Sequence, residues 1–352
     1  MRRERIAVVA PGPAVAGGQS IQARALVEAL AADGHEVDFI ATDPAPRWAR
    51  RIPGLRTLAN QALYLPRLLA LARARTALIF SASYWSFVLA PLPALAAARL
   101  CGASGVLVYH SGEADDHLTR WRRFLRPCLA LARRIVVPSE FLRDVFARHG
   151  HETLVIPNVV DLSAFVYRER VPLRPRLISA RSVEAPYAVD NTVRAFALLK
   201  RRRPDAVLTV AGGGSELSRV KALAESLNVS GIRFLGAVRP EAMPRLLDEA
   251  DLFVNSSIVD NQPVSLLEAF AAGTPVVSTP SGGIARMVRD GENGRLVPAG
   301  DPGAMAAAID DLLVRPDGGR ALARRAREEV ERHAWPRVRP LWDEVAGWGG
   351  TR

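Results

Sequence analysis

A chain of 352 residues with 49% apolar and 24% charged residues suits a globular protein of two ordinary-sized domains and excludes a disordered one. Its net charge of +11 comes almost entirely from arginines spread along the chain, and aromatic residues make up only 6%, which argues against the basic and aromatic face of a nucleic-acid-binding protein. The two cysteines, Cys101 and Cys128, form no CxxC pair, which argues against a disulfide framework or zinc site and indicates a reducing compartment.

Short apolar runs alternate with amphipathic stretches in the first half of the chain, a pattern typical of a parallel sheet covered by helices on both faces. The sequence predicts a helix over 19–32 and strands over 6–10, 37–41, 78–81, 106–110, 135–138 and 153–156. Prolines at 11 and 13 end the first apolar run too early for a signal peptide. Serines and prolines divide the apolar stretch 77–101 into a strand, a loop and a helix, so we predict no transmembrane span there.

The segment 168–176 is rich in proline and arginine and has no periodicity, which predicts an interdomain linker. The alternation then restarts. It predicts helices over 190–202, 215–227 and 264–272, the first beginning at an Asp or Asn cap, and strands over 177–180, 207–211, 232–235, 252–255 and 275–278.

These elements predict an α/β protein with two facing Rossmann-like domains and parallel sheets. The domains are expected over 1–170 and 171–335, with a last helix over 336–352 that packs back on the first domain. Ligands of open α/β sheets lie beyond the carboxyl ends of the strands, so a cleft between the domains is the expected site.

The stretch from Pro44 to Gly112 contains no acidic residue. One-sided positive charge beside apolar runs suits an anionic membrane surface, which attracts each basic residue by roughly 1 kcal/mol. A solvated arginine-rich face explains the pattern equally well. The arginines of this stretch are Arg47, Arg50, Arg51, Arg56, Arg67, Arg73, Arg75 and Arg99.

Two glycine clusters follow predicted strands and precede predicted helices. Gly17 and Gly18 come before the helix from Gln19, and 212–214 repeats the arrangement in the second half. Glycine lets backbone N–H groups approach an anion, and a helix N-terminus adds roughly half a positive charge, so both clusters suit a diphosphate. Neither matches GxGxxG, and tight turns without a ligand explain them as well.

The segment 251–279 places a strand, a polar loop, a helix and another strand in immediate succession. We expect the helix to begin at Pro263, which would aim the amides of Val264 and Ser265 at an anion. Glu268 falls among apolar residues on this helix, where an unpaired carboxylate is costly to bury. Ribose hydroxyls are natural partners for it, and a salt bridge to an arginine is the alternative.

This segment and the Gly17-Gly18 loop resemble the large GT-B family of retaining glycosyltransferases known as family 4. The usual pattern of the family is E-x7-E followed by A-x-G-x-P-V-V; here Asp260 and Glu268 stand at the acidic positions and the run is 271–277. The likeness covers almost the whole chain. Further matching segments are 156–161, 234–236, 281–284 and 290–298.

The resemblance implies roles for particular residues. Glu268 would bind the ribose of a nucleotide-sugar donor, and Asp260 would contact the donor sugar. His110, at the end of a predicted strand, stands where the family often has a histidine facing the donor, so His110 and Asp260 are the expected catalytic residues. The other donor-binding positions are Gly17, Gly18, Arg181, Gly213, Asn261, Val264 and Ser265.

The resemblance also implies a mechanism. Such enzymes retain configuration without a clear protein nucleophile, and the acceptor attacks on the face from which the diphosphate leaves. Stabilising that diphosphate is then the main task of the protein. No D-x-D occurs in the chain, so we expect no metal and no cofactor, and Arg181 and helix amides would serve instead. The pattern departs from the family at Asp260, one methylene shorter than glutamate, and in the absence of a lysine from 182–190.

We therefore expect an enzyme, a retaining hexosyltransferase. It would move a sugar from a UDP- or GDP-sugar to a lipid-linked or saccharide acceptor in cell-envelope or exopolysaccharide synthesis. We expect it in the cytoplasm, peripheral on the inner face of the cell membrane if the basic stretch binds there, with no nucleic-acid partner.

Two alternatives stay open. The missing lysine suggests a non-catalytic donor-binding subunit, and the same scaffold also carries sugar-nucleotide isomerases and phosphorylases. A phosphorylase needs a cofactor lysine, but Lys200 and Lys221 are the only lysines, both on helices predicted to face solvent.

Overall fold

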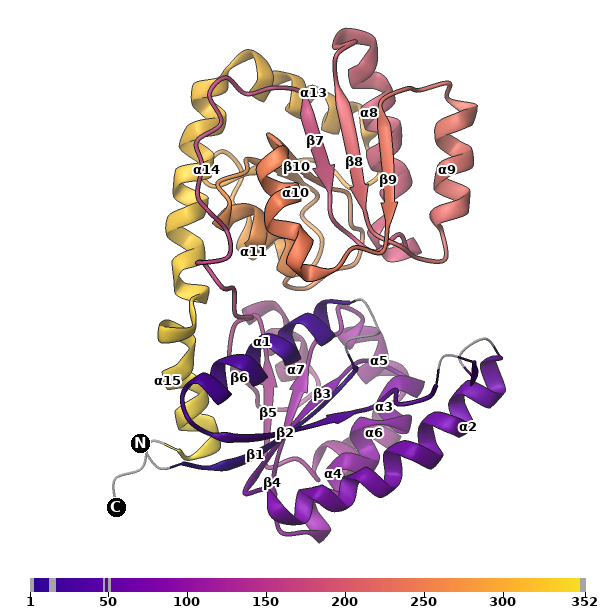
Figure 1. Ribbon diagram of the computed structural model, residues 1–352, viewed down its shortest axis with the longest axis vertical. Helices are drawn as coiled ribbons and strands as arrows, with labels where there is room; N and C mark the ends of the chain where they lie inside the picture. The colour runs from indigo at the N-terminus through magenta and orange to yellow at the C-terminus, as the bar shows by residue number, and fades with distance from the viewer. Residues whose placement is uncertain (1–2, 13–16, 47, 50–51, 349–352) are drawn as a thin grey trace. The chain divides into compact units, whose positions relative to one another are not determined.

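The computed structural model describes residues 3–12, 17–46, 48–49 and 52–348 (Figure 1). The chain forms two compact units, one built from residues 1–159 and 335–352 and the other from 160–334. The division falls between Val159 and Val160, earlier than the boundary expected after residue 170. No helix in the described ranges is long and apolar enough to cross a bilayer.

The first domain contains a parallel sheet with the strand order β2-β1-β3-β4-β5-β6. Each strand predicted from an apolar run is present within two residues of its expected bounds. The strands are β1 (Arg5–Ala10), β2 (Glu36–Ala41), β3 (Thr76–Ser81), β4 (Ser104–Tyr109), β5 (Arg134–Val137) and β6 (Leu154–Val155).

Alternate side chains of these strands feed two separate cores, because successive residues of a strand point to opposite faces. On one face, Ile6 and Val8 pack with helices α1 (Gly18–Ala32) and α15 (Trp335–Ala346). On the other, Ala7 and Val9 belong to the core that holds the remaining helices. These are α2 (Pro53–Tyr64), η2 (Leu65–Arg73), α3 (Trp85–Leu89), α4 (Pro91–Leu100), α5 (Ala114–Arg120), α6 (Arg122–Leu129) and α7 (Glu140–Arg148).

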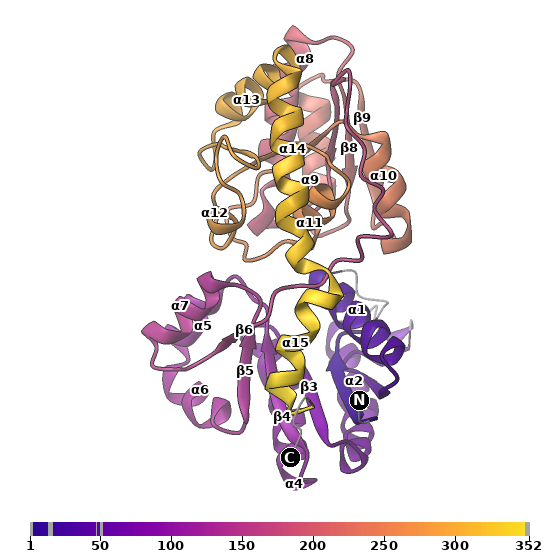
Figure 2. The ribbon, with the colours of Figure 1, turned by 90° about the vertical axis from the view of Figure 1, so that its left-hand side faces the viewer.

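The last helix belongs to the first domain, where Figure 2 shows α15 lying over the sheet. Val338 and Trp342 are buried in the same core as Leu26 and Leu30 of α1. The indole of Trp335 also donates a 2.9 Å hydrogen bond to the carboxylate at the end of α1. The two ends of the chain therefore build one domain.

The second domain repeats the design with the order β12-β11-β10-β7-β8-β9, again all parallel. Its strands are β7 (Arg176–Ser179), β8 (Val207–Ala211), β9 (Ile232–Gly236), β10 (Leu252–Asn255), β11 (Val276–Ser278) and β12 (Arg295–Leu296). One face is covered by α8 (Val189–Arg202), α9 (Leu217–Ser226) and α13 (Pro302–Val314). The other is covered by α10 (Met243–Glu249), α11 (Val264–Ala271), α12 (Ile284–Met287) and α14 (Pro316–Val330).

The N-caps of two helices, α8 and α11, differ from expectation. Helix α8 has no Asp or Asn cap: Ala188 holds the N-cap position in a left-handed conformation, with φ 44° and ψ 44°, and Asp190 lies inside the first turn. In α11, Pro263 is the N-cap itself, in an extended conformation, and the helix begins at Val264. Local propensity indicates roughly where a helix begins, but the conformation of the preceding loop determines which residue is the N-cap.

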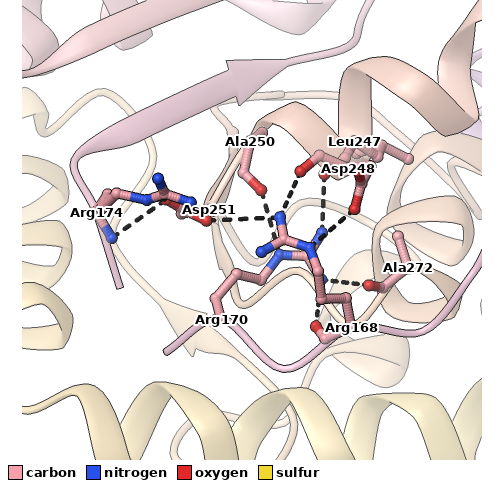
Figure 3. A network of polar contacts seen from close by, with 8 residues as sticks. All are labelled: Arg168, Arg170, Arg174, Leu247, Asp248, Ala250, Asp251 and Ala272. Atoms are coloured by element: carbon pink, nitrogen blue, oxygen red, sulfur yellow. Dashed lines mark hydrogen bonds and ion pairs between the residues drawn. The ribbon is translucent and has the colours of Figure 1, made fainter. Parts of the chain in front are cut away.

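The segment 168–176, expected as an interdomain linker, is hydrogen-bonded to the second domain (Figure 3). Arg170 is only 3% exposed, and its guanidinium donates to the backbone oxygens of Leu247, Ala250 and Ala272. These oxygens lie at the C-terminal ends of α10 and α11, where the last carbonyls have no partner within the helix. Arginines of the segment predicted to be an interdomain linker therefore cap two helices.

Candidate functional site

The strand order of the second sheet reverses between β7 and β10. From β7 the chain proceeds to β8 and β9 on one side, and from β10 to β11 and β12 on the other. Such a reversal leaves a crevice at the carboxyl ends of the two strands, where α/β proteins bind ligands. The loop after β7 carries Arg181 and the loop after β10 carries Asp260.

Arg181 and Asp260 form an ion pair with 2.5 Å between Nη2 and Oδ2, and their side chains are 13% and 10% exposed. The guanidinium carbon also lies 4.1 Å from the ring centroid of Tyr187, close enough for a cation–π contact. Nε of Arg181 is buried and has no hydrogen-bond partner among the described residues. The guanidinium is thus fixed by the protein and keeps donor capacity for a ligand.

The glycines at 212–214 bring a second loop against the Arg181 loop. The amide of Val183 donates to the oxygen of Gly213 at 2.8 Å. A Cβ at Gly212 would lie 1.8 Å from the oxygen of Arg181, and one at Gly214 would lie 2.2 Å from the oxygen of Val183. This approach is possible only without side chains, so these glycines position the loop that carries Arg181.

Glu268 projects from α11 and is only 8% exposed. It makes no hydrogen bond or ion pair within the described ranges, so both oxygens are available to a ligand. Burial raises the pKa of this carboxyl to about 7, and the positive charge of Arg181 opposes the rise. A carboxylate that the protein itself leaves unpartnered is the clearest mark of a binding position in this domain.

The beginning of α11 completes this group. Ser265, in the first turn, is 8% exposed, and its hydroxyl has no hydrogen-bond partner in the part of the chain that the structure describes. The first amides of a helix have no acceptor within it, and the helix dipole favours an anion there. Asn261 is buried in the loop just before α11. Gly283 lies so close to this loop that a Cβ at position 283 would be 2.3 Å from the backbone oxygen of Asn261.

The strand order of the first sheet also reverses, between β1 and β3. Gly17 caps α1 in an extended conformation, and no atom of the described residues lies within 4 Å of a Cβ built at Gly17 or Gly18. The side-chain amide of Gln19 donates to the oxygen of Ser81 at 2.5 Å, which ties the start of α1 to the end of β3. The described residues therefore leave room for an anionic group at the amide-bearing start of this 15-residue helix.

His110 follows β4 of the same sheet. Its amide donates to the oxygen of Ser81 at 3.1 Å, and its ring stacks on Phe80 with 5.2 Å between centroids. Burial lowers the pKa of His110 to about 4, so the imidazole is neutral at physiological pH. A neutral imidazole can donate one hydrogen bond and accept another.

Comparison with known proteins identifies the family. The model of the glycosyl transferases group 1 matches residues 171–329, and the model of glycosyltransferase family 4 matches residues 16–164. Between them the two models cover most of both domains. The chain belongs to glycosyltransferase family 4.

Two curated relatives of this family 4 glycosyltransferase illustrate its range. The phosphatidyl-myo-inositol mannosyltransferase of Mycolicibacterium smegmatis is 28% identical over 271 residues, 73% of this chain and 70% of that protein. A D-inositol 3-phosphate glycosyltransferase of Salinispora tropica is 34% identical over 217 residues, 54% of this chain. That alignment spans 45% of the relative, less than half of its length.

Solved structures show that the fold is GT-B. The sucrose-phosphate synthase of Thermosynechococcus elongatus superposes with a TM-score of 0.79 and 21% identity, over 98% of this chain and 99% of that one. HepE of Anabaena, solved with UDP and glucose, gives a TM-score of 0.72 and 16% identity over 98% and 99%.

In the second domain of this glycosyltransferase, the expected Arg181, Asp260, Val264, Ser265 and Glu268 lie on the loops and helix that follow β7 and β10. The sequence did not predict that the ring of Tyr187 would contact Arg181. Its contact with Arg181 depends on how one loop turns back, and no motif announced it. Within the described ranges, no group of three or more His, Cys, Asp or Glu side chains is placed to hold a metal ion.

Proposed function

We propose that this family 4 glycosyltransferase moves a hexosyl group from a UDP- or GDP-sugar to a lipid-linked or saccharide acceptor with retention of configuration. The observation that carries the proposal is Glu268, a buried carboxylate to which no described residue is hydrogen-bonded or ion-paired, close to Arg181 and on the helix whose N-terminus is at Val264. A nucleoside diphosphate matches these groups, because its ribose offers hydroxyls and its phosphates offer negative charge.

In this proposal Glu268 accepts hydrogen bonds from the ribose. Arg181 and the first amides of α11, at Val264 and Ser265, hold the diphosphate. The guanidinium and the N–H groups stabilise the negative charge that develops on the diphosphate as it leaves. The acceptor hydroxyl attacks the sugar on the face from which the diphosphate departs, which retains the configuration. We expect no metal or other cofactor in this step.

For the first domain we propose that Gly17 and Gly18 contribute backbone amides and that His110 is a catalytic residue. A neutral His110 can hydrogen-bond a sugar hydroxyl without carrying a charge. The relatives named as inositol glycosyltransferases support a hydroxyl acceptor, either in a lipid or in a small soluble molecule.

We also propose that α2 and η2 bring the protein to an anionic membrane surface in cell-envelope or exopolysaccharide synthesis. Leu58 and Leu69 are 70% and 75% exposed there, and Arg56, Arg67 and Arg73 are exposed on the same two helices. Exposed apolar side chains beside unopposed arginines suit the boundary between headgroups and acyl chains. Arg47, Arg50 and Arg51 lie outside the described residues.

A second candidate is a non-catalytic subunit that binds a nucleotide-sugar. It is favoured by the pairing of Arg181 with Asp260, which offsets the positive charge at the phosphate position where the family pattern has an additional lysine. A phosphorylase finds no support: Lys200, expected to face solvent, is half-buried and donates to the oxygen of Ala206, and Lys221 is exposed.

Thermal unfolding with UDP and with GDP tests the proposal. We expect one of them to raise the melting temperature, Glu268→Ala to abolish the shift, and Glu249→Ala, a carboxylate on the surface of α10, to keep it. A screen of nucleotide-sugars with saccharide and lipid acceptors then separates an enzyme from a binding subunit. Absence of any shift with either diphosphate would refute both candidates.

A further inference from the structure

The two carboxylates of the E-x7-E position stand in opposite situations. Both carboxylate oxygens of Asp260 accept hydrogen bonds from within the protein. Oδ2 accepts one from Nη2 of Arg181 at 2.5 Å, and Oδ1 accepts one from the amide of Asn261 at 2.9 Å. Glu268 receives no hydrogen bond within the described ranges. The shorter side chain is therefore directed to an arginine, and the longer one is left for a ligand.

Tyr187 holds the same guanidinium from another direction. Its ring centroid lies 4.1 Å from the guanidinium carbon of Arg181, in a stretch of chain, 182–190, that contains no lysine. An aromatic face attracts the cation and restricts its rotation. Arg181 is thus held at Nη2 by a carboxylate and on its face by a ring.

The loops that carry Tyr187 and Asp260 are bonded to each other. The amides of Ile258 and Val259 donate to the oxygen of Pro186 at 2.8 and 3.2 Å, and the hydroxyl of Ser256 donates to the oxygen of Ala188 at 2.7 Å. Because these bonds join the residues just before Asp260 to those flanking Tyr187, the two groups move as one support.

We propose that Asp260 and Tyr187 are positioning residues that hold Arg181 ready for the diphosphate, so that Asp260 acts through Arg181 and does not contact the transferred sugar. The proposal rests on the proposed nucleotide-sugar function and deepens it. A free arginine loses rotamer freedom when it binds a ligand, and an arginine fixed in advance avoids much of that loss.

The test compares nucleotides that differ only in phosphate and sugar. Calorimetric dissociation constants are measured for the diphosphates UDP and GDP, the monophosphates UMP and GMP, and the corresponding nucleotide-sugars. We expect Asp260→Asn to weaken binding of the diphosphate about tenfold, and of the nucleotide-sugar by the same factor, while monophosphate binding changes less than about twofold. Unchanged monophosphate binding also shows that the variant is folded.

Double substitution separates positioning from direct contact. Once Arg181→Ala is present, adding Asp260→Asn should weaken diphosphate binding no further, because the residue through which Asp260 acts is gone. Tyr187→Ala removes the ring and should weaken diphosphate binding, and Tyr187→Phe, which keeps the ring, should lose less affinity than Tyr187→Ala.

Two results are decisive against the proposal. If Asp260→Asn binds the diphosphate as tightly as the wild type and loses affinity only for the nucleotide-sugar, Asp260 contacts the sugar and the proposal is overturned. Additive losses in the double variant would overturn it as well. If the wild type binds no nucleotide at all, the proposed function itself fails, an outcome distinct from either of these.

Discussion

Arg181, after β7, and Asp260, after β10, meet with 2.5 Å between Nη2 and Oδ2 at the point where the strand order of the second sheet reverses. Of the two carboxylates at the E-x7-E positions, Asp260 is thus paired, whereas Glu268 has no hydrogen-bond or ion-pair partner in the part of the chain that the structure describes. The two acidic residues therefore have different tasks, and the following predictions depend on that difference.

Nucleotide affinity should fall as the pH is lowered through 7. The ionised carboxylate of Glu268 accepts ribose hydroxyls, and its pKa of about 7 means that it is largely protonated at pH 5.5. We expect diphosphate binding to weaken by about tenfold between pH 8 and pH 5.5. The diphosphate itself also titrates in this range, so Glu268→Gln is the reference, and an equal pH dependence in that variant would contradict the assignment.

The contribution of Glu268 to the stability of the ligand-free protein should decrease as the pH rises. The pKa of Glu268 is raised in the folded state, so its stabilising contribution is complete below the unfolded value near 4.5 and is lost as the pH rises through about 7. Glu268→Gln should gain on the order of 3 kcal/mol over the wild type between pH 4.5 and pH 8. Urea unfolding at several pH values measures this, and parallel curves for the two proteins would show that the carboxyl titrates normally.

His110→Ala should slow transfer and leave nucleotide binding intact. His110 belongs to the first domain, and Glu268 and Arg181, proposed to hold the ribose and the diphosphate, belong to the second. We therefore expect kcat to fall by about a hundredfold while the dissociation constant of the diphosphate changes little. Its pKa of about 4 implies no loss of activity from its protonation between pH 8 and pH 6. His149→Ala, at a histidine paired with Asp115, is the control and should be nearly as active as the wild type.

Arg170→Ala should destabilise the second domain. It removes the donors for three helix-end carbonyls in a buried place, and we expect a loss of about 3 kcal/mol in unfolding free energy. Arg245→Ala, which breaks only an exposed pair with Glu249, should cost less than about 1 kcal/mol. Equal midpoints of urea unfolding for the two variants would mean that 168–176 contributes nothing to the domain.

Vesicle sedimentation tests the membrane surface. The wild type should sediment with phosphatidylserine vesicles at low salt and be released at high salt. Arg56→Glu together with Arg67→Glu should abolish sedimentation, whereas the same charge change at Arg201 and Arg325, exposed in the second domain, should not. A wild type that stays in the supernatant at low salt would remove the proposal.

The architecture was predictable because it depends on local patterns. Apolar runs of four or five residues bounded by turns predicted the main strands, and the segment 251–279 predicted β10, α11 and β11 almost to the residue. Glu268 could be singled out for the same reason: its apolar neighbours along one helix already implied burial.

Other features depend on contacts between distant parts of the chain. The composition of 168–176 predicted a linker. The hydrogen-bond partners of Arg170 in this segment nevertheless lie 77 to 102 residues away along the chain, at the ends of two helices. Tyr187 gave no signal at all, because its role exists only when its loop turns back over Arg181.

The sequence by itself determined the two parallel sheets, the family and the buried carboxylate on α11, since periodicity and motif spacing are properties of neighbouring residues. Only the tertiary structure decided that Asp260 is bound to Arg181 while Glu268 is left unpartnered. The two residues of that ion pair are 79 positions apart, and they meet because β7 and β10 are adjacent strands of one sheet.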